Sequence, residues 1–130
     1  MLEAKELRIG NNILFSDDST IFEVVEIDKN GLHVKNDNEE TWIELENFEG
    51  IKLTEEILMR LGFISNPYQD RYELDGINVE CNKLRKDEIT LWIEFMPHIK
   101  NVHQLQNLYF ILKNKELTLK PLLLPHKTII

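Results

Sequence analysis

The apolar positions of the first fifty residues predict a series of short strands separated by polar turns. Residues 21–27 are rich in β-branched and aromatic side chains, and residues 32–35 and 41–45 alternate between apolar and polar. Asn30 and Gly31 mark one turn because both residue types tolerate positive φ. Four or five strands this short favour a small, strongly twisted barrel of the Src-homology or Tudor kind over a large open sheet.

A change of hydrophobic period after residue 53 predicts a short helix. Thr54 suits the N-cap, acidic residues follow in the first turn, and Gly62 suits the left-handed position that ends a helix. Residues 71–74 and 77–81 flank the turn Asp75-Gly76, which predicts an antiparallel hairpin. Every odd residue from 89 to 95 is apolar, which predicts a further half-buried strand.

A second helix is predicted to begin after Asn101, because Gln104 stands at the spacing of a capping box. Its predicted apolar face comprises Val102, Leu105, Leu108, Tyr109 and Leu112. Gln106, Asn107 and Lys113 are expected to face water, and residues 116–119 to form a closing strand.

These elements predict one α+β domain over residues 1–119, with a barrel-like meander at 1–53 and a helix-sheet-helix part at 54–119. An apolar tail follows at residues 120–130. It contains Leu122, Leu123 and Leu124 between two prolines, which disfavour a helix. Three leucines are costly to leave in water, so the tail either wraps over the domain or docks on a partner.

The composition is that of a globular chain, with 42% hydrophobic and 29% charged residues. Cys81 is the single cysteine and can form no disulfide within the chain, which favours a reducing, cytoplasmic location. The first residues do not resemble a signal peptide. No run of eighteen apolar residues is present, so no membrane span is expected.

The net charge of -8 is distributed unevenly. Residues 1–50 carry 13 acidic and 4 basic side chains, whereas residues 97–130 carry 1 acidic and 5 basic ones. An acidic N-terminal half repels nucleic-acid phosphates and attracts basic protein surfaces. The same acidity also serves simply to keep a small domain soluble.

The sequence shows no catalytic constellation. Its histidines lack metal-ligand spacing; His98 and His103 near a helix start are expected to be solvated or capping. Cys81 is expected to be a small core residue rather than a nucleophile. We therefore predict a protein that is not an enzyme and takes no metal or cofactor.

Protein binding is the interpretation that remains. The predicted partner-binding residues are Glu39, Glu40, Trp42 and Glu44, with Leu122, Leu123 and Leu124 of the tail. Phe22 and Trp42 have the strand parity opposite to Val25 and Ile43, so they are either exposed anchors for a partner or core residues.

An alternative interpretation is a small nucleic-acid-binding module. It rests on the basic turn Lys83, Arg85 and Lys86 together with Trp92, since basic residues beside exposed aromatics suit that role. Trp92 lies on the strand face opposite the apolar residues. The simpler interpretation is that the basic residues form an ordinary hairpin loop and that Trp92 packs against neighbouring residues.

Three blocks of the chain resemble a family of small uncharacterised proteins encoded by prophages and other mobile elements of bacteria. The blocks are Leu7–Asn11, Leu53–Glu56 with Leu61–Phe63, and His98-Ile99 with the signature Val-His-Gln-Leu-Gln-Asn-Leu-Tyr-Phe at residues 102–110. The tail beyond Leu119 departs from the family pattern. The resemblance implies the same layout of barrel, helix, hairpin sheet and helix, with no catalysis.

Mobile-element origin, small size and acidity are together similar to phage-encoded inhibitors of bacterial defence, including anti-CRISPR proteins. By this analogy the expected partner is a host protein such as a basic, nucleic-acid-binding effector nuclease. The sequence thus predicts a non-catalytic inhibitor of a host nucleic-acid-targeting system.

Overall fold

The computed structural model describes residues 2–66, 71–80 and 99–120 of the 130-residue chain, and it confirms the α+β class. The chain divides into two compact units. The first combines Met1–Leu53 with Ile99–Leu117, and the second combines Thr54–His98 with Thr118–Ile130. The chain leaves the first unit at Leu53, and this unit takes in the last helix, which therefore belongs with the N-terminal sheet.

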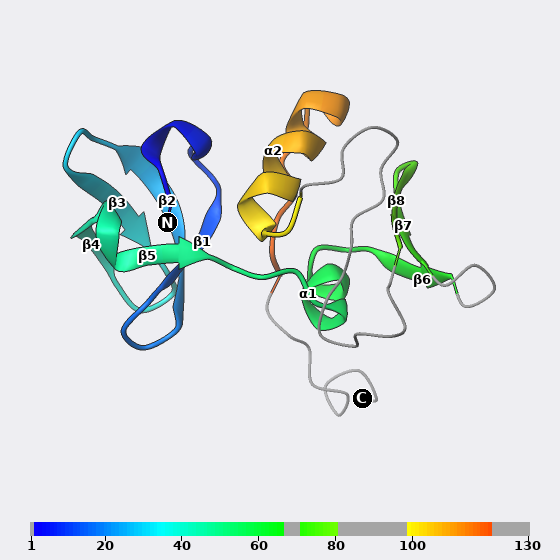
Figure 1. Ribbon diagram of the computed structural model, residues 1–130, viewed down its shortest axis with the longest axis horizontal. Coiled ribbons are helices and arrows are strands. Elements are labelled where there is room, and N and C mark those ends of the chain that lie inside the picture. Colours follow the sequence, from blue (N-terminus) through cyan, green and yellow to red (C-terminus); the bar gives the residue numbers. More distant parts are fainter. Residues whose placement is uncertain (1, 67–70, 81–98, 121–130) are drawn as a thin grey trace. The chain divides into compact units, whose positions relative to one another are not determined.

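The first unit is built on a five-stranded antiparallel sheet with the order β4-β3-β2-β1-β5 (Figure 1). The strands are β1 (Asn12–Phe15), β2 (Thr20–Ile27), β3 (Gly31–Lys35), β4 (Glu40–Glu44) and β5 (Phe48–Gly50). Single turns of 3-10 helix, η1 (Ala4–Glu6) and η2 (Leu45–Asn47), precede β1 and β5. The strands β2, β3 and β4 follow the runs predicted at residues 21–27, 32–35 and 41–45. No closed barrel is found among the described strands, because β4 and β5 are the two ends of the sheet.

One face of this sheet carries the core of the first unit. One cluster of buried residues there comprises Leu2, Leu7, Ile13, Phe22, Val24, Leu32, Val34 and Phe48. Phe15, Phe22 and Phe48 meet edge to face, with ring centroids 5.9–6.4 Å apart. Phe22 is only 3% exposed, so it is a core residue and not an exposed anchor for a partner.

A β-bulge in β2 changes the alternation of side chains after Val24. The register pairs Val24 with Val34 and then Glu26 with His33, which leaves Val25 as the extra residue. In a regular strand Glu26 would point to the same side as Phe22 and Val24. The bulge reverses the parity, so Glu26 lies on the outer face of the sheet.

The helix α2 (Val102–Lys113) begins as predicted, with Asn101 at the N-cap. The Gln104 side chain accepts hydrogen bonds from the backbone N–H of Lys100 at 2.8 Å and of Asn101 at 3.1 Å. These bonds satisfy donors that a helix start otherwise leaves free. Val102, Leu105, Leu108 and Tyr109 are buried as expected, but Leu112 is 53% exposed.

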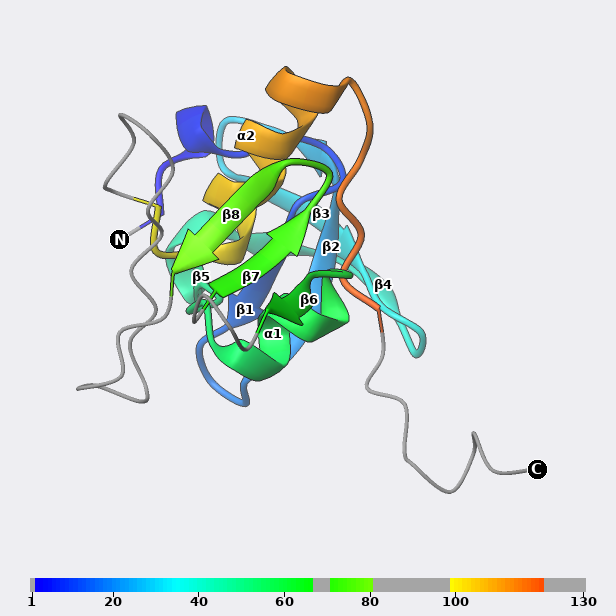
Figure 2. The ribbon, with the colours of Figure 1, turned by 90° about the vertical axis from the view of Figure 1, so that its right-hand side faces the viewer.

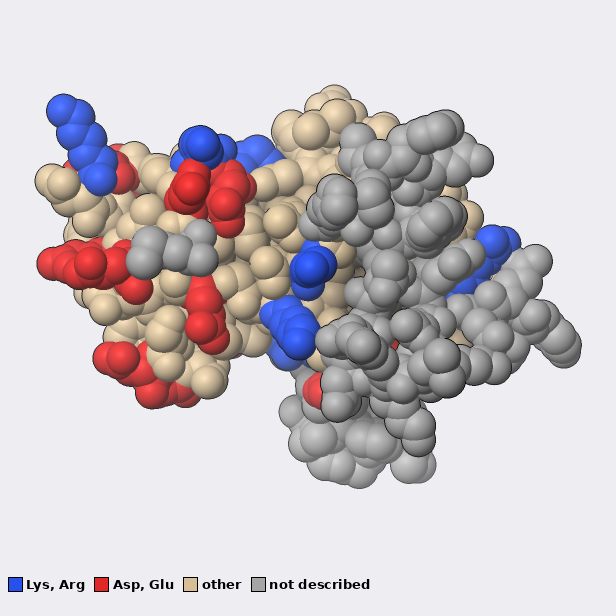
Figure 3. Space-filling model, viewed as in Figure 1, with Lys and Arg blue, Asp and Glu red and all other residues tan. Residues whose placement is uncertain are grey.

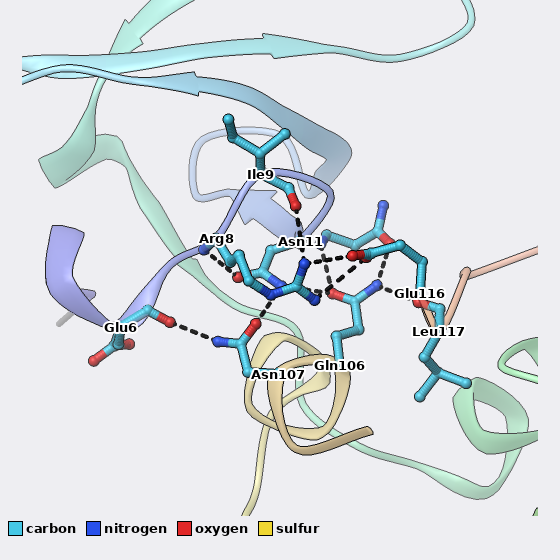
Figure 4. Close-up of polar contacts among 9 residues, drawn as sticks. Glu6, Arg8, Ile9, Asn11, Gln106, Asn107, Glu116 and Leu117 are labelled. Atoms are coloured by element: carbon cyan, nitrogen blue, oxygen red, sulfur yellow. Dashed lines mark hydrogen bonds and ion pairs between the residues drawn. The ribbon is translucent and has the colours of Figure 1, made fainter. Parts of the chain in front are cut away.

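Gln106 is completely buried, contrary to the prediction that it faces water (Figure 4). Its Nε2 donates to Asn12 Oδ1 and to the carbonyl of Leu117, both at 2.8 Å. Its Oε1 accepts from the backbone N–H of Asn12, also at 2.8 Å. A buried amide this well satisfied joins α2 to β1 and to the chain that follows the helix.

Asn107 also points inward, where it meets the segment before β1. It accepts a 2.9 Å hydrogen bond from Nδ2 of the buried Asn11, and its own Nδ2 donates to the carbonyl of Glu6 at 2.9 Å. Asn11 Oδ1 in turn accepts from the backbone N–H of Arg8 at 2.7 Å. The segments at residues 7–11 and 102–110 therefore meet through side-chain amides.

The predicted closing strand at residues 116–119 is absent: the described residues 114–120 form no strand. Side chains hold this segment instead. Glu116 forms an ion pair with Arg8, whose guanidinium lies 4.2 Å above the Phe110 ring centroid. The Leu117 carbonyl accepts from Gln106, so its hydrogen-bonding need is met without a neighbouring strand.

The second unit contains α1 (Glu55–Arg60), and the predicted caps of this helix are confirmed. Thr54 Oγ1 accepts a 3.2 Å hydrogen bond from the backbone N–H of Ile57. At the other end Gly62 has a φ of 98°, and the N–H groups of Gly62 and Phe63 donate to Met59 and Leu58, respectively. This is the Schellman arrangement, which needs a residue at positive φ.

A three-stranded antiparallel sheet completes the described part of the second unit (Figure 2). It has the order β6-β7-β8, with β6 (Ile64–Asn66), β7 (Arg71–Leu74) and β8 (Ile77–Glu80). The hairpin at Asp75-Gly76 is confirmed; both residues have positive φ. The predicted strand at residues 89–95 and the predicted core position of Cys81 lie outside the described residues. Within the described ranges, no helix has the length and apolar character needed to cross a bilayer.

Candidate partner-binding surface

The outer face of β2, β3 and β4 carries the candidate site. We define the Trp42 surface as the side chains of Glu26, His33, Glu40, Trp42 and Glu44. The strand register places them together, because His33 pairs with both Glu26 and Trp42, and Gly31 pairs with Glu44. The opposite face of these strands is the apolar core described above.

Trp42 is the centre of this surface and is 53% exposed. One face of its indole stacks on the His33 imidazole, with ring centroids 5.1 Å apart and an angle of 18° between the planes. The stack fixes the orientation of the indole before any partner arrives. A large aromatic side chain that is both exposed and held in place is well suited to anchor an interface.

Two carboxylates hold His33 from either side. Its Nε2 lies 2.9 Å from Glu40 Oε2 on β4, and its Nδ1 lies 3.7 Å from Glu26 Oε2 on β2. The His33 side chain is 21% exposed, whereas the two glutamates are about 60% exposed. The imidazole is thus the inner member of the group, and the carboxylates form its outer rim.

The surroundings of the Trp42 surface are acidic. Figure 3 shows acidic side chains gathered over the N-terminal sheet on the face in view. On the outer face of the sheet Lys35 lies 3.9 Å from Glu23, so one of the few basic groups there already has an acidic neighbour. The field at this surface favours a positively charged partner.

The surface continues past the end of β4 into an open pocket of about 530 Å³. The pocket is lined by Leu2, Lys29, Asn30, Glu44, Leu45 and Glu46. A hydrogen bond to Glu46, together with repulsion between the two carboxylates, raises the pKa of Glu44 above its usual value. A positive charge placed between Glu44 and Glu46 would relieve that repulsion.

The structure brings together three of the predicted partner-binding residues, namely Glu40, Trp42 and Glu44. Glu39 is exposed in the turn before β4, where its N–H donates to Asn36 Oδ1 at 2.9 Å. The predicted tail residues Leu122, Leu123 and Leu124 lie outside the described residues. So do Lys83, Arg85, Lys86 and Trp92 of the alternative nucleic-acid site.

Sequence reasoning missed His33 and Glu26 as members of the site. A signal for His33 was present, because His33 and Trp42 are equally far from the turn at Asp37-Asn38 and therefore face each other across the hairpin. Glu26 carried no such signal. Its position depends on the bulge at Val25, which the alternation of residue types does not reveal.

The other polar cluster of the first unit, around Gln106 and Asn11, is structural, since its amides bond to one another and to the backbone. His103 is buried there and its Nε2 lies 2.9 Å from Glu6 Oε1, so it is neither solvated nor capping as the sequence suggested. No group of three or more metal-ligating side chains occurs among the described residues.

Comparisons of the chain with protein-family models, with curated proteins and with solved structures found no match. The resemblance to the family of mobile-element proteins therefore stays a prediction from the sequence.

Proposed function

We propose that this protein is a non-catalytic binding module that recognises a basic segment of another protein through the Trp42 surface. The observation that carries the proposal is an exposed tryptophan, held by a stacked histidine and bordered by carboxylates on β2 and β4. Tryptophans in such positions contribute a large share of binding energy. Arginine or lysine side chains are attracted both to the indole face and to the acidic rim.

The partner that we propose is a host effector that targets nucleic acid, in keeping with the similarity to phage-encoded inhibitors of defence. Such an effector carries basic channels for its own substrate, and an acidic surface with an aromatic anchor complements them in charge.

We further propose that the meander of β1–β5 curls into a small barrel of the Src-homology or Tudor kind. The return of β5 to β1 after a 3-10 turn supports that reading.

A pull-down from a bacterial lysate, with and without nuclease treatment, tests the function. Tagged wild-type protein, Trp42→Ala and Ile111→Ala are compared, with retained proteins identified by mass spectrometry. Ile111 is the matched control because it is an apolar side chain of the same unit, 77% exposed on α2. We expect wild type and Ile111→Ala to retain one basic protein, and Trp42→Ala to bind it about 30-fold more weakly.

Equal retention by Trp42→Ala would contradict the proposal. Retention that disappears when nucleic acid is digested would also contradict it, and would favour the alternative site at Lys83, Arg85, Lys86 and Trp92. Direct nucleic-acid binding would weaken steeply with salt, because each phosphate contact releases counterions.

A further inference from the structure

We propose that the basic partner segment binds as an added β-strand along the edge of β4. This inference rests on the proposed function and specifies how the Trp42 surface is used. A strand that joins a sheet edge gains backbone hydrogen bonds, and its alternate side chains then line the face on which Trp42 lies.

The two edges of the five-stranded sheet differ in how they are covered. The β5 edge is closed by the chain that enters α2. Val102 donates to the carbonyl of Ile51 at 2.8 Å, and Leu53 donates to that of Lys100 at 3.0 Å. A Cβ on Gly50 of β5 would lie only 2.7 Å from Asn101 Cγ, so the Asn101 side chain packs directly against this end of β5. No described strand or bridge pairs with the outer side of β4.

The hydrogen-bond phase of the β3–β4 hairpin shows which backbone groups face the open side. Asn36 N–H donates to the carbonyl of Glu39 at 2.9 Å, which makes these two a hydrogen-bonded pair. In an antiparallel ladder such pairs alternate with pairs that are not hydrogen-bonded. The register of the hairpin therefore gives hydrogen-bonded pairs at Thr41 and Ile43.

It follows that the N–H and C=O groups of Glu40 and Trp42, and the N–H of Glu44, point away from β3. These are the same residues whose side chains lie on the outer face. An added strand would exchange hydrogen bonds with them, and its side chains opposite them would lie beside the Trp42 indole and the two carboxylates. Basic residues at alternate positions of the segment match this arrangement.

The acidic side chains of β4 disfavour the binding of a second copy of the chain along this edge. Two β4 edges that pair antiparallel about Trp42 would place Glu40 of one copy directly opposite Glu44 of the other. Like charges in that position destabilise strand pairing, whereas lysine or arginine there stabilises it.

Glu44→Pro tests the added strand because it removes one N–H from the open edge. Glu44 has a φ of -63° and a ψ of 140°, which proline adopts without strain, and its N–H is not used by β3. Glu44→Gln is the matched control, since it removes the same charge and keeps the N–H. The probe is a peptide that alternates lysine with valine, and binding is measured by calorimetry with the full-length protein.

We expect Glu44→Gln to bind the peptide more weakly than wild type, and Glu44→Pro to bind about tenfold more weakly again, as for the loss of one backbone hydrogen bond. Circular dichroism and amide spectra of β3 should remain those of the wild type in both variants. Methylating the peptide nitrogens on one edge of the strand should abolish binding, while methylating the other edge should not.

Equal affinities for Glu44→Pro and Glu44→Gln would overturn strand addition but leave the proposed function intact, provided that Trp42→Ala still reduces binding. An unaltered affinity of Trp42→Ala would overturn both. A wild-type dimer in sedimentation that Glu44→Pro dissociates would show that a second copy occupies the edge, and would also overturn the proposal.

Discussion

His103 on α2 shows how a single polar residue can make the stability of the first unit depend on pH. Its side chain is fully buried, its Nε2 lies 2.9 Å from Glu6 Oε1, and its Nδ1 has no hydrogen-bond partner within the described part of the chain. Burial lowers the pKa of His103 below 6.5, although the hydrogen bond and the charge of Glu6 act in the opposite direction. The folded chain therefore favours the neutral imidazole.

We predict that the free energy of unfolding decreases as the pH falls from about 7.5 to about 5.5. Below 6.5 the unfolded chain binds a proton at His103 that the folded chain does not, until the lower folded pKa is reached. The expected loss is about 1.4 kcal/mol for each unit by which the pKa is lowered. Urea unfolding at both pH values measures it.

His103→Gln is the control for this prediction, because the glutamine amide can still donate to Glu6 but does not titrate. Its free energy of unfolding should change less over the same pH range than that of the wild type. Identical pH dependence in the two proteins would show that another group is responsible.

The residues that sequence reasoning misplaced share one property. Gln106, Asn107 and His103 are polar side chains that composition assigns to the surface, yet they point inward. Their burial depends on acceptors and donors supplied by Glu6, Asn11 and Asn12, about a hundred residues away in the sequence. Local patterns carry no information about such distant partners.

At the scale of elements, α1 is a helix of only six residues, so its caps carry an unusually large share of its stability. Thr54→Ala removes the side-chain acceptor of the Ile57 N–H and should destabilise the second unit by about 1 kcal/mol. Thr54→Ser keeps the acceptor and should have little effect. Amide hydrogen exchange at Leu61, which bonds within the helix, reports the difference.

Elements defined by local chemistry were the ones that the sequence predicted correctly. The caps of α1, the Asp75-Gly76 hairpin and the strands of the meander depend on residues within a few positions of each other. The prediction of a closing strand at residues 116–119 was wrong, because side chains of Arg8 and Gln106 hold that segment in place of a neighbouring strand. The candidate surface was half predicted: Trp42 and its glutamates follow from alternation, while Glu26 depends on a bulge.

At the scale of the molecule, the first unit is made from two separate stretches of chain. Leu53 N–H donates to the carbonyl of Lys100 at 3.0 Å, so the chain leaves this unit and returns to it at neighbouring points. Residues 54–98 are thus an insertion between β5 and α2. Segments whose ends lie close together can often be shortened without loss of the surrounding fold.

We predict that the first unit still folds when residues 54–98 are replaced by a glycine-serine linker of about five residues. Amide spectra of β1–β5 and α2 should retain the chemical shifts of the full-length protein, since their hydrogen bonds lie within the unit. Loss of dispersed amide signals from β1 and α2 would contradict this. Replacing residues 99–117 in the same way is the control, and should unfold the sheet because it removes Gln106 and His103.

The hydrogen bonds that join Gln106 to Asn12, and Asn107 to Asn11, have a consequence for the newly made chain. Ribosomes add residues from the N-terminus, so the strands β1–β5 emerge while their polar partner does not yet exist. At about 5–20 residues per second, the delay from residue 53 to residue 106 is about 3–10 s. During that interval Asn11 and Asn12 must stay hydrated, and the first unit cannot be completed until α2 has been translated.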